Sequence, residues 1–224
     1  MAKQKREVLI IADAQLIYLT DPQCGWCFGY SDTIQDIVAH YQDDERVELS
    51  LVTGGLFHPA LTTGPEFAEE KRPIAKRVSQ TFGVRFSEEY FTNVLGAGRL
   101  DSLVPCQAIN VVKINTPEVV FSYAKHLIDA AFKQGRNISD ISVCLEVTKE
   151  YGLDAEKIAS KMQGREVAEM TRASFEFARQ VGTGFPSLFL RMESGLEHLG
   201  GAQLDLQTLK ARVEVLMNSA SAIS

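Results

Sequence analysis

The sequence predicts an α/β fold into which an all-helical domain is inserted, and three observations support this prediction. An apolar run near the N-terminus leads into a helical pattern and then into an alternating strand. Almost every segment over 65–164 then has helical periodicity. A strand, a tight turn and a second strand follow before a closing amphipathic helix. The expected parts are 1–62, the first half of the α/β domain; 63–164, the helical insert; and 165–224, the second half.

The composition is that of an ordinary globular protein. The 224 residues are 45% hydrophobic and 23% charged, and this length suits one large domain or a small domain that carries an insertion. The formal net charge is -6, which does not favour a nucleic-acid-binding surface. No nucleic-acid partner is therefore expected.

We expect a cytoplasmic protein with no membrane partner. The basic start of the chain is followed only by the short apolar run Val8–Ile11, whereas a signal peptide needs roughly 7 to 15 apolar residues. No run approaches the length of a membrane-spanning helix. Residues 7–11 themselves form either a short extra strand or an unstructured segment before the first strand.

The first half begins with a strand over 14–20, because these residues are mostly apolar and end just before Pro22. Apolar residues then recur at helical spacing as far as Tyr41. Residues 47–52 alternate as a strand does and end at Gly54-Gly55. The order strand, helix, strand is therefore expected before the insert.

The insert is predicted to be helical from its periodicity and from its helix-end signals. Thr116 is expected as an N-cap with Pro117 in the first helical position, and this helix ends at Gly135. Another helix is expected over 141–151, and Asp154 should cap the next one. These signals predict separate helices joined by short turns.

The second half returns the chain to the sheet. A long helix is expected over 165–181, and a strand over 187–192 follows it. A tight turn then leads to a partner strand over 196–199, and an amphipathic helix over 204–217 closes the domain.

Cys24 and Cys27 are separated by two residues at the junction of the first strand and the first helix. Cys24 is expected at the helix N-terminus, where unpaired N–H groups and the helix dipole stabilise a thiolate. Cys27 then lies about one turn further in and can close a small disulfide ring. The pattern predicts dithiol redox chemistry in which Cys24 is the nucleophile and Cys27 the resolving thiol.

Half of a zinc site is the alternative interpretation of this cysteine pair. Zinc would need two more ligands at matching spacing, but Cys106 and Cys144 stand alone and the four histidines form no pair. We therefore expect no metal. Cys144 shares an apolar stripe with its neighbours, and core packing is the expected role for it.

Four motifs follow one another along the chain: Asp21-Pro22-x-Cys24-x-Trp26-Cys27-x-Gly29-Tyr30, Gly54-Gly55-Leu56-Phe57, Asp101-Ser102-x-x-Pro105-Cys106-x-Ala108 and Gly182-x-Gly184-Phe185-Pro186-Ser187. Together they resemble segments of the DsbA-like, FrnE-like branch of the thioredoxin superfamily. The matching segments extend from about Leu16 to the C-terminal helix, which is most of the chain. The cysteine pair and Pro186 are the two most specific signals.

The resemblance implies a thioredoxin-like fold with an inserted helical domain, and an oxidoreductase of the protein disulfide isomerase type. Cys24 and Cys27 would exchange electrons with protein or low-molecular-weight disulfides and thiols. Pro186 would be the cis-proline that faces the cysteine pair. Trp26 and Phe185 are expected at the substrate-docking edge, with core packing as the alternative for each. No metal or organic cofactor is implied, and glutathione is a candidate co-substrate.

Two departures from the family pattern concern the direction of electron flow. Tyr18 stands where related proteins often carry a buried acid, and Gly25-Trp26 separates the cysteines in place of the residues typical of strong oxidants or of thioredoxin. Two other functions remain as alternatives. One is a glutathione-dependent transferase or isomerase of the kappa-class or hydroxychromene carboxylate isomerase type, although these use Ser at the position of Cys24. The other is a non-catalytic redox-sensing or chaperone module.

Cys106 is a candidate auxiliary thiol. A helix that starts at Pro105 would place Cys106 in its first turn, and the resemblance puts this helix end over the mouth of the active site. The alternative, which we favour, is core packing, since Cys is among the most frequently buried residue types.

Overall fold

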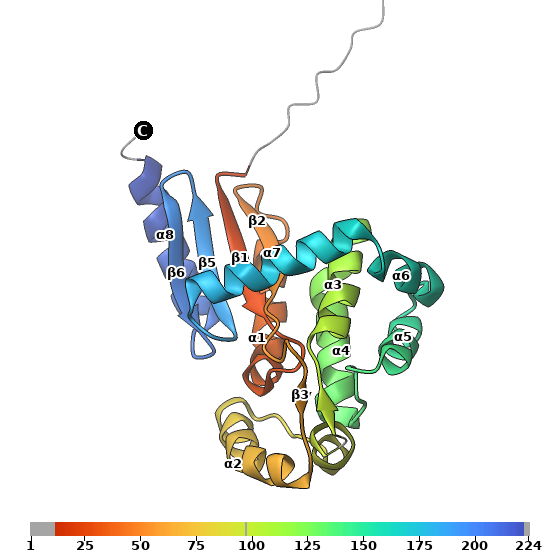
Figure 1. Ribbon diagram of the computed structural model, residues 1–224. Helices are drawn as coiled ribbons and strands as arrows, with labels where there is room; N and C mark the ends of the chain where they lie inside the picture. Colours follow the sequence, from red (N-terminus) through yellow and green to blue (C-terminus); the bar gives the residue numbers. More distant parts are fainter. Residues whose placement is uncertain (1–11, 97, 222–224) are drawn as a thin grey trace, which may run out of the picture.

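The computed structural model describes residues 12–96 and 98–221, and the strand considered for 7–11 lies outside these residues. None of the helices in this described part is long and apolar enough to cross a membrane. The elements (Figure 1) are β1 (Ala14–Thr20), α1 (Gly25–Tyr41), β2 (Val47–Thr53), β3 (Leu61–Thr62), α2 (Pro65–Phe82), the π-helical η1 (Tyr90–Leu95), β4 (Arg99–Leu100), α3 (Leu103–Asn115), the 3-10 turn η2 (Pro117–Val119), α4 (Val120–Gln134), α5 (Ile141–Glu150), α6 (Ala155–Met162), α7 (Arg165–Val181), β5 (Ser187–Met192), β6 (Gly195–Gly201) and α8 (Leu206–Ser221).

A four-stranded sheet forms the centre of the α/β part, with strand order β2-β1-β5-β6. β1 is parallel to β2 and antiparallel to β5, and β5 is antiparallel to β6. β2 is parallel to β1 because α1 carries the chain back between them. The predicted α/β fold with a helical insert is confirmed, and the strand expected over 47–52 is one residue longer.

Different helices cover the two faces of the sheet. In β1, Leu16 and Tyr18 belong to the larger core together with residues of α1 and α8, whereas Ile17 and Leu19 join a smaller core with Ala178 of α7. This alternation is what a strand buried on both faces requires. Figure 1 shows α7 crossing in front of β1 and β2.

The helices α2 to α6 lie between β2 and β5 in the sequence, and in Figure 1 they extend to the side of the sheet and below it. α3 joins this helical part to the sheet. Its Lys113 Nζ donates to the Leu51 carbonyl of β2 at 2.6 Å, and its Asn110 side chain donates to the Thr53 hydroxyl at 3.3 Å. The end of β2 is therefore held directly against α3.

Three helix starts differ from the prediction, and the simplest case is α8, which begins at Leu206, two residues later than expected. α3 begins at Leu103, two residues before Pro105, because the Asp101 carboxylate accepts the Leu103 N–H at 2.9 Å and proline is tolerated in a first turn. The segment after Thr116 makes one 3-10 turn before α4 begins. The Thr116 hydroxyl donates back to the Val112 carbonyl of α3, so it does not cap α4.

The small sheet β3–β4 was not predicted. Leu61 pairs with Leu100 and Thr62 with Arg99. Strands of two residues are too short to show alternation, and the paired residues are far apart in the sequence. Only the folding of the insert brings them together.

Candidate active site

Cys24 is held at the start of α1 by the turn that follows β1. Its N–H donates to the Asp21 carbonyl at 3.0 Å, and its own carbonyl accepts the Phe28 N–H at 3.0 Å. The Cys24 backbone is extended, with φ -89° and ψ 118°, and its side chain makes no capping hydrogen bond. The thiol is therefore available for chemistry at the positive end of the helix dipole.

The Cys24 thiol lies against the segment that precedes β5. It donates to the Phe185 carbonyl at 3.6 Å, and the Phe185-Pro186 bond is cis, as expected. The Phe185 ring packs against the smaller core and lies so close to Gly54 that a Cβ on that glycine would be 1.8 Å from it. In this arrangement the ring fills space beside the sheet while the backbone faces Cys24.

Cys27 lies one turn into α1 and is completely buried. The Asp21 N–H donates to its sulfur at 3.5 Å. Burial raises the pKa of the Cys27 thiol well above its usual value, and the adjacent Cys24 raises it further. Both cysteines are free thiols. The pair is therefore asymmetric, because Cys24 retains 6% exposure whereas Cys27 is shielded and held protonated.

A cavity of about 190 Å³ opens beside Cys24. Trp26 lines it, and its indole meets the ring of Phe82 edge-on at a centroid distance of 6.1 Å. Lys71 is the one charged residue in the lining, so the cavity suits an apolar group next to the reactive sulfur. The full lining is Gln23, Cys24, Gly25, Trp26, Leu56, Phe57, Phe67, Lys71, Ile74, Ala75, Phe86, Tyr90 and Leu95.

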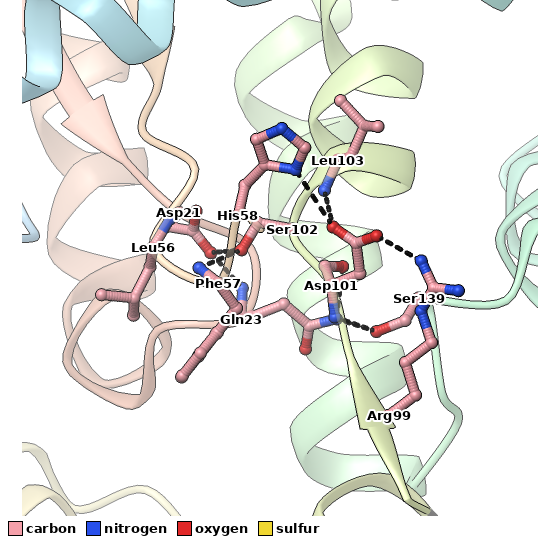
Figure 2. Close-up of polar contacts among 10 residues, drawn as sticks. All are labelled: Asp21, Gln23, Leu56, Phe57, His58, Arg99, Asp101, Ser102, Leu103 and Ser139. Carbon is pink, nitrogen blue, oxygen red and sulfur yellow. Dashed lines mark hydrogen bonds and ion pairs between the residues drawn. The ribbon is translucent and has the colours of Figure 1, made fainter. Parts of the chain in front are cut away.

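A buried carboxylate holds three segments together behind this cavity (Figure 2). Asp21 accepts the Gln23 N–H at 2.9 Å, the Leu56 N–H at 2.7 Å and the Ser102 hydroxyl at 2.9 Å. The Ser102 oxygen in turn accepts the Phe57 N–H at 3.1 Å. The active-site turn, the segment after β2 and the start of α3 are thus fixed relative to one another.

A second polar group continues this network into the insert. The Gln23 side chain and the Asp101 N–H both donate to the Ser139 hydroxyl oxygen, at 2.9 and 3.0 Å. The Asp101 carboxylate accepts the Leu103 N–H and forms an ion pair with Arg99 at 2.7 Å. Figure 2 shows these residues meeting from β4, α3 and the loop before α5.

Comparison with protein-family models and with curated proteins finds no significant match. Solved structures match in fold. A protein from Nitrosomonas europaea, provisionally described as a protein disulfide isomerase, is 20% identical, with a TM-score of 0.80 over 92% of this chain and 98% of that one. The cytosolic disulfide reductase DsbM from Pseudomonas aeruginosa is 24% identical, with a TM-score of 0.72 over 91% and 98%. Reduced DsbA1 from Neisseria meningitidis is 10% identical, with a TM-score of 0.61 over 99% and 91%.

The chain has a DsbA-like thioredoxin fold. Tyr18 occupies the position at which the family resemblance predicts a buried acid. It is only 3% exposed. Its hydroxyl has no hydrogen-bond partner among the described residues, and burial raises its pKa well above the usual value. Tyr18 is therefore a neutral group at neutral pH.

Asp21 is the buried acid that the sequence did not single out. In the sequence Asp21 stands out only as part of a motif, although a polar residue between an apolar strand and Pro22 is a signal that could have identified it. Burial raises the pKa of Asp21 from 3.8 to about 6, because the loss of solvation outweighs the hydrogen bonds that the carboxylate accepts. The turn that carries Cys24 thus contains an acid whose pKa of about 6 lies close to physiological pH.

Cys106 ends the first turn of α3 and is completely buried. Burial raises the pKa of its thiol well above the usual value, the charge of Asp21 raises it further, and the Gly55 backbone and Thr53 hydroxyl act in the opposite direction. Cys144 is also buried in the core, and burial raises its pKa to about 12. In residues 12–96 and 98–221, no three His, Cys, Asp or Glu side chains gather closely enough to hold a metal ion.

Proposed function

We propose that this protein is a thiol-disulfide oxidoreductase that uses Cys24 and Cys27. The observation that carries the proposal is the asymmetry of the pair. Cys24 stands at the N-terminus of α1 beside an open apolar cavity, and Cys27 is buried one turn behind it. A thiolate at the first position attacks a disulfide, and a shielded second thiol acts only after the substrate is attached.

Reduction of a disulfide R–S–S–R′ takes two steps. The Cys24 thiolate attacks one sulfur, forms a mixed disulfide with R and releases R′ as a thiolate. Cys27 then loses its proton, and its sulfur attacks that of Cys24. The R thiolate leaves and takes up a proton, and a Cys24–Cys27 disulfide remains. Two electrons pass from the protein to the substrate, and the same steps in reverse oxidise a dithiol.

The cavity and the Phe185 carbonyl together form the proposed docking site. An apolar side chain of the substrate would enter the cavity beside Trp26. The Phe185 carbonyl, which precedes Pro186, faces the Cys24 sulfur on the other side. Disulfide isomerisation uses the same site when a thiol of the substrate itself displaces Cys24 before Cys27 does. Protein disulfides and low-molecular-weight disulfides are both proposed substrates.

Glutathione is the proposed co-substrate, and no metal or organic cofactor is part of the proposal. Two glutathione thiols would reduce the Cys24–Cys27 disulfide and leave as glutathione disulfide. The structural neighbour DsbM has been solved with GSH and is described as cytosolic. Both descriptions support the proposed co-substrate and a cytoplasmic location.

Insulin reduction in the presence of dithiothreitol tests the proposal. Cys24→Ser should fall to the rate of dithiothreitol alone. Cys27→Ser should stop turnover but gain the mass of one glutathione when treated with glutathione disulfide. Cys144→Ala, which changes a buried thiol far along the chain, is the matched control and should retain activity. Equal insulin reduction by the wild type and by Cys24→Ser would overturn the proposal.

A further inference from the structure

A second cavity, of about 260 Å³, lies between α3 and α7. It shares no lining residue with the cavity beside Cys24. The chain between the two is short, since Leu56 and Phe57 line the first cavity and His58 lines the second. The lining is His58, Leu103, Gln107, Ala168, Thr171, Arg172, Phe175 and Arg179, and none of these residues is acidic.

α7 contributes one continuous face to this cavity. Its lining residues recur at the three- and four-residue intervals that place side chains on one side of a helix. Arg172 and Arg179 are seven residues apart, which separates them by about 10 Å along the helix axis. Phe175 lies between them and is 4% exposed. The two arginines thus flank the buried Phe175 ring along the cavity wall.

Neither arginine has a partner in the described part of the chain. No ion pair and no hydrogen bond of either guanidinium occurs there. By contrast, Arg72 and Arg136 each bind two carboxylates. In a protein with a formal charge of -6, two unpaired guanidinium groups at one cavity form a local positive field.

The cavity also presents neutral donors. Thr171 is 2% exposed, and its hydroxyl oxygen accepts the Asn110 side-chain N–H at 2.9 Å. The Thr171 hydroxyl proton has no acceptor among the described residues, so it is available to a bound ligand. Gln107 of α3 adds an amide group on the opposite wall.

His58 is oriented by Asp101 at the edge of the cavity. Its Nδ1 lies 3.6 Å from an Asp101 carboxylate oxygen, and its ring packs on Phe175 at a centroid distance of 5.4 Å. Figure 2 shows the other ring nitrogen on the side away from Asp101. Asp101 is engaged by Arg99 and the Leu103 N–H, and it forms no ion pair with Arg172 or Arg179.

We propose that this cavity binds a small organic dianion, a polycarboxylate or a phosphate ester, between Arg172 and Arg179. Guanidinium groups bind both kinds of anion through paired, charge-assisted hydrogen bonds. The volume lies just below the roughly 300 Å³ at which pockets begin to hold drug-sized ligands, which favours a compact ligand. The site shares no lining residue with the redox cavity. The two are connected by the segment that contains Leu56, Phe57 and His58, and by the contact of His58 with Asp101, whose carbonyl accepts the Gln23 side chain.

Isothermal titration calorimetry tests the site with citrate as the carboxylate probe and pyrophosphate as the phosphate probe, at constant ionic strength. The test variant is Arg172→Gln/Arg179→Gln. The matched control, Arg77→Gln/Arg165→Gln, removes the same charge from positions that are equally exposed but do not line the cavity, one of them on α7. We expect at least one probe to bind the wild type, and about tenfold or more weaker binding in the test variant.

The control should change binding less than about threefold, because Arg77 and Arg165 do not line the cavity and solvent screens charges that lie away from the ligand. Gln107→Met removes a neutral donor without a change in charge and should also weaken binding. Absence of binding by both probes, or equal weakening in the two double variants, overturns the proposal. Insulin reduction should be unchanged in both double variants, so this result is independent of the role of Cys24.

Discussion

Replacing Asp21 by Asn tests the electrostatics of the active-site turn. Asp21 is completely buried, and burial raises its carboxyl pKa from 3.8 to about 6. Because the folded-state pKa exceeds the unfolded one, the carboxyl stabilises the folded state most below pH 3.8, and this contribution is lost as the pH rises through 6. The difference between the two pKa values corresponds to about 3 kcal/mol, of which about 1.3 kcal/mol is expected between pH 7 and pH 5.

The assay is urea unfolding of reduced wild type and of Asp21→Asn at pH 5 and pH 7. Asn cannot titrate, so the wild type should gain about 1.3 kcal/mol of unfolding free energy relative to the variant when the pH falls from 7 to 5. The substitution also changes the absolute stability of the folded variant, independently of pH. The carboxylate accepts hydrogen bonds from Gln23, Leu56 and Ser102. The amide nitrogen of Asn is a donor, so it would face one of these donors and that hydrogen bond would be lost.

Asp36→Asn provides the control. Asp36 is an exposed carboxylate of α1 with no partner among the described residues, so its variant reproduces the change in net charge alone. If Asp21→Asn and the wild type lose or gain stability in parallel between pH 5 and pH 7, the Asp21 carboxyl does not titrate in that range. The argument from burial would then be refuted.

Two further predictions concern the surroundings of the cysteine pair. Gly54→Ala should lower the unfolding free energy by about 1–3 kcal/mol and slow insulin reduction, because the new Cβ would displace the Phe185 ring and with it the carbonyl that faces Cys24; unchanged urea midpoints would contradict this. Because Cys106 is completely buried, mild oxidation of Cys27→Ser with glutathione disulfide should leave Cys24 as a glutathione adduct. Peptide mapping that finds a Cys24–Cys106 disulfide would instead identify Cys106 as an auxiliary thiol.

The position of the cysteine pair could be predicted from the sequence because its signals are local. The periodicity of apolar residues identifies the first strand and the first helix, and the cysteine pair lies at their junction. The first strand, the first helix and the strand that begins at Val47 all formed where these patterns indicated. The closing hairpin and the glycine-ended helices of the insert were predictable for the same reason.

The polar framework of the site was decided by tertiary structure. Asp21 and Ser102 are 81 residues apart, and Gln23 and Ser139 are 116 residues apart. The periodicity of a sequence shows which face of a helix or strand is apolar. It does not show which polar group from a distant segment will contact that element. The roles of Asp21 and Ser102 therefore appeared only when α3 was packed against the turn that carries Cys24.

Residue types and spacing alone determined that this chain has a dithiol at a helix N-terminus within an α/β fold that carries a helical insert. Tertiary structure alone decided which thiol is shielded, which acid titrates near pH 6, and that Arg172 and Arg179 share a cavity with His58. The physical reason is that desolvation and nonlocal contact depend on what surrounds a side chain in space. Those surroundings come from segments that the sequence keeps far apart.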